Sequence, residues 1–245
     1  MNSNRLILLP LLVLSLTGAT PSSAGPIATA KSTKKADASK AQEKTVHWIP
    51  LFNGQGTQAW RGFGKPSFPA QGWVVEDGWL KHQAKGGGGD IITRELFSDF
   101  ELEFEWKIAP GGNSGVKYFI DEVRGAAIGH EYQLIDDALH PDASHGPNRK
   151  TAALYDALPP VNPQVKPIGE INTSRILVQG LHVEHWLNGA KVLEYKLESP
   201  ELLAAKAKSK FKSEFKWGTR FSTPILLQDH GDEVAFRNIR IRPLK

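Results

Sequence analysis

The stretch SDFELEFEWKI, residues 98–108, decides the fold class of this 245-residue chain. Within it apolar residues alternate strictly with charged ones. The apolar positions are Phe100, Leu102, Phe104, Trp106 and Ile108. Successive side chains of a β-strand point to opposite faces, so this spacing predicts a strand with one buried and one wetted face.

Similar signals extend on both sides of this stretch. Asp77-Gly78 divides WVVEDGWLKH, and Asn188-Gly189 divides HVEHWLNGAKVLEYKL. Both dipeptides favour two-residue turns of β-hairpins. Further short strands are predicted in SGVKYFI, HEYQLID, RILVQG and EVAFRNIRIR, which are separated by Gly, Pro and Asn clusters.

A single helix is predicted, over residues 198–211 (ESPELLAAKAKSKF), with Pro200 near its start. The pattern contains no alternation of strands and helices that would indicate a parallel sheet. Many antiparallel strands and one late helix predict an all-β sandwich or jelly roll of two sheets.

The first 44 residues differ in composition from the remainder. Residues 1–24 combine Arg5, an apolar run LILLPLLVLSL and small residues up to Ala24, as a signal peptide cleaved near Ala24 does. Residues 25–44 are rich in Ala, Lys, Ser and Thr and predict a flexible tether. We therefore expect a secreted or periplasmic protein with one folded domain over residues 45–245 and no integral membrane span.

The net charge of the chain comes from this N-terminal segment. The formal charge of +4 comes from residues 1–44, so the predicted domain is neutral. Nothing in that domain indicates a nucleic-acid partner. The chain has no cysteine, which excludes disulfides and a lipid anchor on cysteine.

Polar residues recur on what should be the outer faces of strands. In residues 130–136, alternation places Tyr132 and Leu134 in the core and leaves Glu131 and Gln133 facing outward. An ordinary solvated sheet face would give the same pattern.

Several other segments carry comparable residues. They are Asn113 among glycines, Tyr155 before a Pro-Pro loop, Lys166, Glu170 and Asn172 in KPIGEIN, Trp186, and Gln228 and His230 after the strand ILL. Gln228 and His230 share a face, whereas Asp229 points away and is expected to fix the turn or the surroundings of the histidine. Amides and carboxylates bind vicinal hydroxyls, and an indole stacks on a sugar ring, so one shared face would suit a carbohydrate.

The histidines and glycines do not match the motifs of other kinds of site. His130, His140 and His145 lie near aspartates, but their spacing matches no compact set of metal ligands. Four glycines at 86–89 precede Asp90 without the Gly-Lys-Ser/Thr of a phosphate loop, and they predict a flexible turn. No Gly-x-Ser-x-Gly motif of an acyl hydrolase is present.

Taken together and in order, eight motifs resemble the 3-keto-disaccharide hydrolase family. They are LFNG, WVVEDGWL, DFELEFEWKI, GNSGVKYF, YQLID, KPIGEIN, HWLNGAKVLEY and LLQDHGDEVAFRNIRIR, and they cover about residues 48–245. The resemblance implies a concanavalin A-like jelly roll and an exported enzyme acting on glycosides oxidised to a ketone at C3. Ile171 departs from the family, which usually has Trp there, so we expect a different substrate preference or looser binding.

The implied chemistry starts from the ketone, which acidifies the proton on C2. A base removes that proton, the oxygen on C1 leaves by β-elimination, and water then adds to the unsaturated ketone. The base would be His230 or Glu131, and the acid Glu170 or Tyr155. The groups that hold hydroxyls or the enolate would be Asn113, Gln133, Asp136, Lys166, Asn172, Trp186 and Gln228.

A divalent metal bound by carboxylates and His230 is the alternative group that would stabilise the enolate, and it is the one cofactor considered for the site. The main alternative function is a non-catalytic, lectin-like carbohydrate-binding module, since a jelly roll hosts both classes. A conventional glycosidase with two opposed carboxylates and a structural envelope protein are the remaining alternatives.

Overall fold

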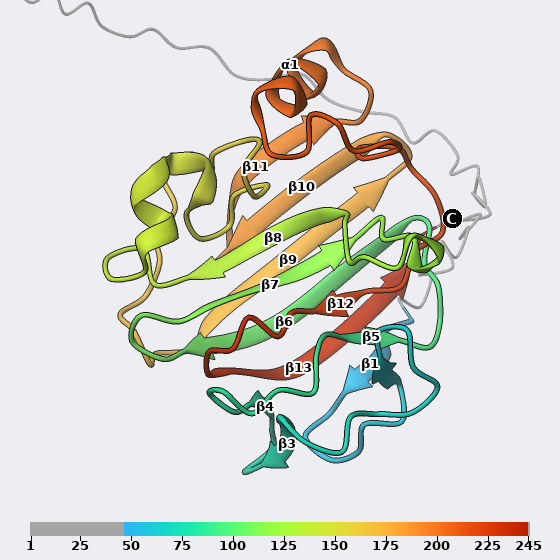
Figure 1. Ribbon diagram of the computed structural model, residues 1–245, viewed down its shortest axis with the longest axis vertical. Coiled ribbons are helices and arrows are strands. Elements are labelled where there is room, and N and C mark those ends of the chain that lie inside the picture. The colour runs from blue at the N-terminus through green and yellow to red at the C-terminus, as the bar shows by residue number, and fades with distance from the viewer. Residues whose placement is uncertain (1–46, 245) are drawn as a thin grey trace, which may run out of the picture. The chain divides into compact units, whose positions relative to one another are not determined.

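The computed structural model describes residues 47–244, so the predicted signal peptide and tether lie outside the described residues. The described part of the chain folds into two antiparallel sheets that pack face to face (Figure 1). This is the predicted jelly-roll sandwich.

The larger sheet has eight strands in the order β11-β10-β9-β6-β13-β4-β3, with β1 paired to β13. Their bounds are β1 Ile49–Phe52, β3 Trp73–Glu76, β4 Trp79–His82, β6 Phe100–Ile108, β9 Asn172–Gln179, β10 His182–Leu187, β11 Ala190–Lys196 and β13 Val234–Pro243.

The smaller sheet has five strands in the order β2-β5-β12-β7-β8. Their bounds are β2 Trp60–Gly62, β5 Ile91–Thr93, β7 Asn113–Tyr118, β8 His130–Ile135 and β12 Leu226–Leu227. Both sheets have one face toward the core and one outer face.

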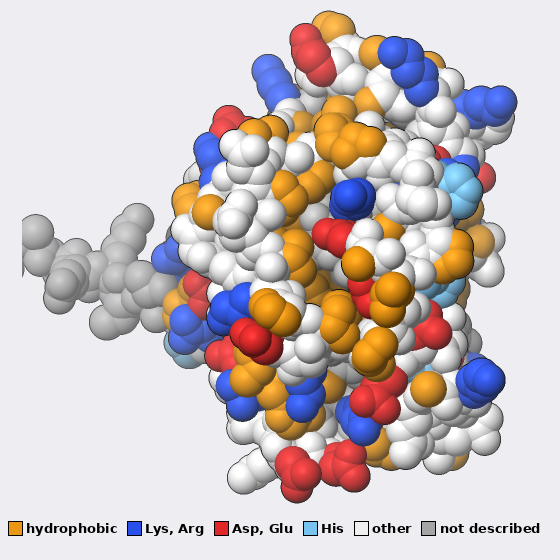
Figure 2. Space-filling model, turned by 90° about the vertical axis from the view of Figure 1, so that its left-hand side faces the viewer, with side chains coloured by type: hydrophobic (Ala, Val, Ile, Leu, Met, Phe, Trp, Pro, Cys, Tyr) orange, Lys and Arg blue, Asp and Glu red, His pale blue; other side chains and the backbone are white. Residues whose placement is uncertain are grey.

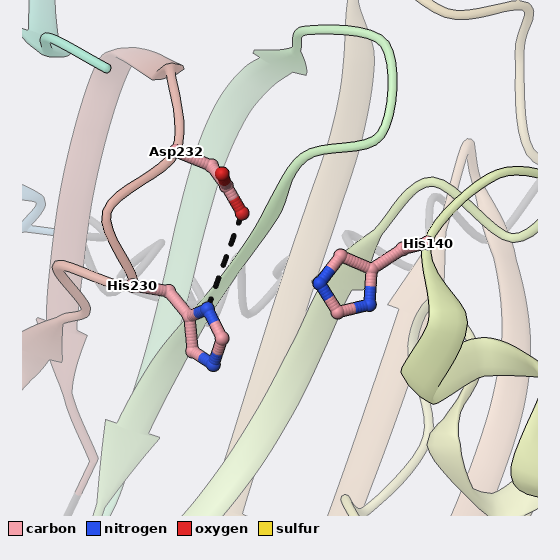
Figure 3. Close-up of side chains that lie close together, drawn as sticks. All are labelled: His140, His230 and Asp232. Atoms are coloured by element: carbon pink, nitrogen blue, oxygen red, sulfur yellow. Dashed lines mark ion pairs between the residues drawn. The ribbon is translucent and has the colours of Figure 1, made fainter. Parts of the chain in front are cut away.

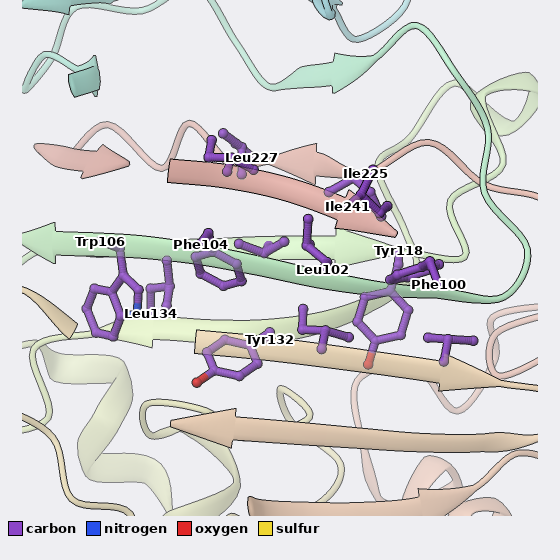
Figure 4. Packing of buried hydrophobic residues seen from close by; sticks show 14 of the residues in the cluster. Phe100, Leu102, Phe104, Trp106, Tyr118, Tyr132, Leu134, Ile225, Leu227 and Ile241 are labelled. Atoms are coloured by element: carbon purple, nitrogen blue, oxygen red, sulfur yellow. The ribbon is translucent and has the colours of Figure 1, made fainter. Parts of the chain in front are cut away.

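The core lies between the sheets, and the side chains buried in it confirm the alternation predicted for residues 98–108. The apolar side chains of β6 are buried, from Phe100 at 0% exposure to Ile108 at 4%. They pack with Tyr118, Tyr132 and Leu134 of the smaller sheet (Figure 4). Removing a buried aromatic ring of this kind costs about 3–5 kcal/mol.

Both predicted hairpin turns are present. Asp77 and Gly78 join β3 to β4 with φ angles of 49° and 76°, and Asn188 and Gly189 join β10 to β11 with φ angles of 49° and 85°. A positive φ at both central residues is the requirement of a type I′ turn, and Asn-Gly and Asp-Gly meet it with little strain.

The predicted helix is shorter than expected. Helix α1 spans Pro200–Lys208, and the Ser199 hydroxyl caps it by accepting a hydrogen bond from Leu202 N at 3.2 Å. Three short 3₁₀ helices, η1 (Glu122–Arg124), η2 (Pro141–His145) and η3 (Pro147–Arg149), lie in the loops around the smaller sheet. Among the described residues, no helix has the length and apolar character needed to cross a membrane.

A buried hydrogen-bonded chain connects the two sheets through the core. His185 Nδ1 donates to the carbonyl of Ala152 (2.9 Å), so its Nε2 accepts from the Tyr118 hydroxyl (2.7 Å). Because the Tyr118 hydroxyl has given its one proton to His185, it accepts a hydrogen bond from the Tyr195 hydroxyl (2.8 Å). The Tyr195 hydroxyl in turn accepts a hydrogen bond from His130 Nδ1 (2.8 Å). One carbonyl therefore fixes the direction of every hydrogen bond and the tautomer of both neutral histidines.

Candidate active site

The outer face of the smaller sheet carries the group of polar residues predicted for residues 113 and 131–133. In the antiparallel register of β7 and β8, Lys117 lies opposite Glu131 and Gly115 opposite Gln133. Because Tyr132 and Leu134 are in the core, Glu131 and Gln133 project outward, as predicted. We call the surface formed by Asn113, Gly115, Lys117, Glu131, Gln133 and Gln228 the small-sheet face.

Three side chains form the centre of this face. Lys117 Nζ lies 3.5 Å from Glu131 Oε2. In the amide orientation that satisfies both neighbours, Gln228 donates to Glu131 Oε1 at 3.3 Å and accepts from Lys117 Nζ at 3.0 Å. Glu131 is only 5% exposed. An anion and a cation are thus held side by side, each with a hydrogen bond to the same amide.

Tyr155 lies beside Glu131 because residues 152–155 run along the edge of β8. Tyr155 N donates to the carbonyl of Glu131 at 3.0 Å, and Ala152 N donates to that of Gln133 at 2.9 Å. The Tyr155 hydroxyl donates to Asp142 Oδ2 at 2.8 Å. Burial, with a smaller contribution from the Asp142 carboxylate, raises the pKa of Tyr155, so the phenol remains protonated near neutral pH.

Further charged groups surround this centre. Arg149 forms ion pairs with Asp142 and Asp156, and Lys210 Nζ lies 4.3 Å from the centre of the Tyr155 ring. On the other side, Asp90 accepts a hydrogen bond from Asp229 N at 2.9 Å. Burial raises the pKa of Asp90, and the positive charge of Lys117 partly offsets this rise. The site therefore contains both proton donors and proton acceptors.

Two buried amides of the face have unused hydrogen-bonding groups. Asn113 is 4% exposed and Gln133 is 1% exposed. Asn113 Oδ1 and both polar atoms of the Gln133 amide have no partner. Buried polar groups are nearly always paired, so these atoms are suited to the hydroxyls of a ligand.

His230 lies beyond the end of β12 and joins a different group. His230 Nδ1 is 4.0 Å from Asp232 Oδ2, and His140 faces both from the loop after β8 (Figure 3). Asp232 Oδ2 also accepts from Asn113 N at 3.0 Å, which connects this group to the small-sheet face.

Two imidazoles and a carboxylate could together hold a divalent cation. However, His140 Nδ1 accepts a hydrogen bond from Asp142 N at 3.1 Å, so the neutral ring carries its proton on Nε2. Coordination through Nε2 would require the proton to move to Nδ1, and that hydrogen bond would be lost. His130 belongs to the core chain and is not part of this group.

Several residues predicted to hold the substrate lie elsewhere or already bind the backbone. Asp136 accepts hydrogen bonds from Gly111 N, Ala138 N and Leu139 N, so its carboxylate anchors a turn. These hydrogen bonds lower its pKa even though burial opposes them.

The segment containing Lys166, Glu170 and Asn172 lies at the ends of β6 and β8, against Trp106 and Ile135. Asn172 Oδ1 accepts from Lys166 N and Asn188 Nδ2, and Glu170 is exposed in the turn before β9. Strand β9 begins only at Asn172, so Glu170 lies outside it, and no local pattern showed which sheet this strand joins.

Trp186 lies on β10 and lines a groove on the outer face of the larger sheet. It therefore does not share the small-sheet face with Glu131. The Asn188-Gly189 turn located its strand correctly, but sequence alone gave no sheet assignment.

Lys117, Asp90, Lys210, His140 and Asp232 were not predicted as site residues. Lys117 had a usable signal, because alternation in SGVKYFI places it on the same side as Gly115 and Asn113. The others lie in loops and turns, where no periodicity applies.

Comparison with known proteins supports a relationship along the whole described domain. Residues 47–242 match the model of the 3-keto-alpha-glucoside-1,2-lyase-like domain. A 3-keto-disaccharide hydrolase of Bacteroides thetaiotaomicron is 38% identical over 229 residues, which cover 80% of this chain and 78% of that protein.

Solved structures show the same relationship. Two proteins of Parabacteroides distasonis ATCC 8503, described as candidate glycosyl hydrolases, are similar in structure. One is 32% identical with a TM-score of 0.73, covering 81% of this chain and 94% of its own. The other is 30% identical with a TM-score of 0.61, covering 81% of this chain and 100% of its own.

Proposed function

The chain belongs to the family of 3-keto-alpha-glucoside-1,2-lyase-like domains, and on this premise we propose that it cleaves 3-keto-disaccharides by elimination and hydration. The observation that carries the proposal is the adjacent carboxylate, ammonium and phenol of Glu131, Lys117 and Tyr155 on one outward face. These are the three kinds of group that an elimination next to a ketone requires.

Glu131 is the base that removes the proton from C2. Its carboxylate is held in place by Lys117 and Gln228 on the floor of the small-sheet face. When Glu131 accepts the proton it becomes neutral, and the charge of Lys117 is then free to face the enolate oxygen. Lys117 therefore stabilises the transition state more than the ground state, which is the condition for raising kcat.

Tyr155 is the acid that protonates the departing oxygen on C1. In this step the Tyr155 O–H turns from Asp142 to the departing oxygen, and the neighbouring Arg149 and Lys210 stabilise the phenolate that remains until water reprotonates it. The elimination breaks the C2–H and C1–O bonds and forms a C1–C2 double bond and a free alcohol. Water then adds its oxygen to C1 and a proton to C2, and the two steps together are a hydrolysis.

His230 and Glu170 were the alternative base and acid. His230 is exposed and lies beyond the end of β12, and Glu170 lies in the turn before β9. Their positions favour Glu131 and Tyr155. A divalent cation at His140, His230 and Asp232 would supply positive charge to a substrate oxygen at that end of the face.

The test is an NMR measurement in D₂O with the purified chain, a 3-keto-disaccharide and the same disaccharide before oxidation. We expect cleavage of the keto sugar only, with deuterium entering C2. Glu131→Gln should abolish both exchange and cleavage. Tyr155→Phe should slow cleavage more than exchange.

His230→Gln and an EDTA-treated sample complete the set. Loss of exchange in His230→Gln but not in Glu131→Gln would reassign the base. Loss of turnover on EDTA treatment that is restored by added Mn²⁺ or Zn²⁺ would add a metal. Binding of sugars without any turnover would favour the lectin-like alternative, and equal cleavage of the unoxidised sugar a conventional glycosidase.

We also propose that the protein is exported, on the basis of the apolar run and small residues within positions 1–24. N-terminal sequencing of the mature protein from cell fractions tests this. A mature chain that begins near Gly25 in the periplasmic or extracellular fraction is expected. A full-length cytoplasmic chain would contradict it.

A further inference from the structure

A groove of about 830 Å³ lies on the outer face of the larger sheet, on the side of the sandwich opposite to the small-sheet face. It crosses the neighbouring strands β13, β6, β9 and β10, and β1 and the residues after it form one wall. Its lining includes Asn53, Glu103, Thr173, Arg175, Trp186 and Asn238. Neighbouring strands are about 4.8 Å apart, so the groove accommodates an extended ligand better than a single small ring.

The charges along the groove are already paired within the protein. Glu103 pairs with Arg240 (2.6 Å), Glu105 with Arg237 (2.6 Å), and Glu101 with Arg175 (2.8 Å) and Arg242. On the side of the molecule that Figure 2 shows, acidic and basic side chains are also interspersed. An ionic ligand would therefore gain little here, whereas a neutral polar ligand would find many donors and acceptors.

The groove also contains a rigid aromatic side chain. Trp186 Nε1 donates to Glu184 Oε2 at 2.6 Å, and the guanidinium of Arg175 covers one face of the indole, 3.8 Å from the ring centre, so a ligand would meet the opposite face. These two contacts fix the ring before any ligand arrives, which lowers the entropy lost on binding. A sugar ring has an apolar face that packs on an aromatic ring and a hydroxyl rim that binds planar polar groups.

We propose that this groove is a second carbohydrate site that binds a neutral oligosaccharide chain without cleaving it. Trp186 contacts a sugar ring, and Asn53, Thr173 and Asn238 bind hydroxyls along the chain. This site is separate from the proposed catalytic face. It would hold the protein on a glycan while the small-sheet face acts on a keto sugar.

The experiment is calorimetric titration of the full chain with cello-oligosaccharides and malto-oligosaccharides of increasing length. We expect saturable binding that tightens with length. Trp186→Ala should weaken it at least tenfold while leaving turnover of a 3-keto-disaccharide unchanged. Thr173→Arg, which places a long side chain across the groove from an exposed strand position, should block binding without removing core packing.

Trp79→Phe is the control, because Trp79 lies on the same sheet and is covered by Arg237 but does not line the groove, and an aromatic replacement keeps the packing of this buried position. It should leave glycan binding intact. No saturable binding to either series would overturn the proposal, as would binding lost in Glu131→Gln but kept in Trp186→Ala and Thr173→Arg. A self-association lost in Thr173→Arg, with no glycan bound, would assign the groove to a second copy of the chain instead.

Discussion

Glu131 occupies its position because the residue beside it on β7 has no side chain. If residue 115 were alanine, its Cβ would lie 2.9 Å from Glu131 Cγ and 3.0 Å from Glu131 Cδ. Gly115 does not have a positive φ angle, so the backbone there would accept alanine. The glycine is therefore required by the carboxylate and not by the strand.

Gly115→Ala should consequently lower kcat by about 10–100-fold, because a displacement of the base by about 1 Å is enough for such an effect. The free energy of unfolding should change by less than about 1 kcal/mol, since the strand gains a residue with less backbone freedom in the unfolded chain. Steady-state kinetics and urea unfolding measure the two quantities.

A double-mutant cycle with Glu131→Asp provides the control. The shorter carboxylate leaves room for the methyl group, so the effects of Gly115→Ala and Glu131→Asp should be less than additive. Strict additivity would show that the glycine acts elsewhere.

Lys117 gives the second prediction for a single residue. Lys117→Gln keeps a polar group beside Gln228 but removes the charge proposed to face the enolate, so kcat should fall by about 10²–10³-fold. Deuterium exchange at C2 should fall with it. Lys107→Gln, which changes a lysine over Trp79 on the outer face of the larger sheet, should leave both rates unchanged. Equal losses in the two variants would count against this role.

At the scale of elements, the four glycines at 86–89 form a fixed part of the structure rather than the flexible turn expected from composition. Gly88 approaches Gln71 so closely that an added Cβ would overlap the carbonyl oxygen of Gln71. Asp229 fastens the loop through Gly89 N and Gly231 N, both at 2.9 Å, and pairs with buried His82. This explains why Asp229 points away from Gln228 and His230.

Asp229→Ala should therefore lower the free energy of unfolding by about 1–3 kcal/mol, because it leaves two backbone donors and His82 without their carboxylate. Hydrogen exchange should accelerate at residues 86–90 in particular, and calorimetry or urea unfolding gives the total. Glu76→Ala, at an exposed position of β3, should change stability by less than about 0.5 kcal/mol. Unchanged exchange at residues 86–90 would mean that the glycine contacts alone hold the loop.

For the whole molecule, the sequence predicted the strands better than their placement. The period of two in β6 and the Asp-Gly and Asn-Gly turns are local signals, and the structure confirms them. Which sheet a strand joins depends on long-range pairing, such as β12 between β5 and β7, which no local pattern encodes. Alternation along β8 therefore grouped Glu131 and Gln133 correctly, whereas Gln228 reaches them only through the pairing of β12 with β7. Trp186 and Asn172, on strands of the larger sheet, were placed on the wrong surface.

The buried chain of His130, Tyr195, Tyr118 and His185 joins both sheets, so it affects the stability of the whole fold. Burial lowers the pKa of His130 to about 3 and that of His185 to about 4, from an ordinary value of 6.5. The unfolded chain therefore binds more protons than the folded one between about pH 4 and 6.5. Stability must fall as the pH decreases through that range, by up to about 1.4 kcal/mol per pH unit for each histidine.

His130→Asn isolates this effect, because the asparagine amide can donate to Tyr195 as His130 Nδ1 does but cannot be protonated. The smaller side chain should lower stability at pH 7.5 by about 1–3 kcal/mol. The loss of stability between pH 6.5 and pH 5, measured by urea unfolding, should be roughly halved. His145→Asn, at a position whose side chain is 64% exposed, should leave the pH dependence as it is in the unaltered protein. An undiminished pH dependence in His130→Asn would show that other groups cause the acid sensitivity and that the core chain does not.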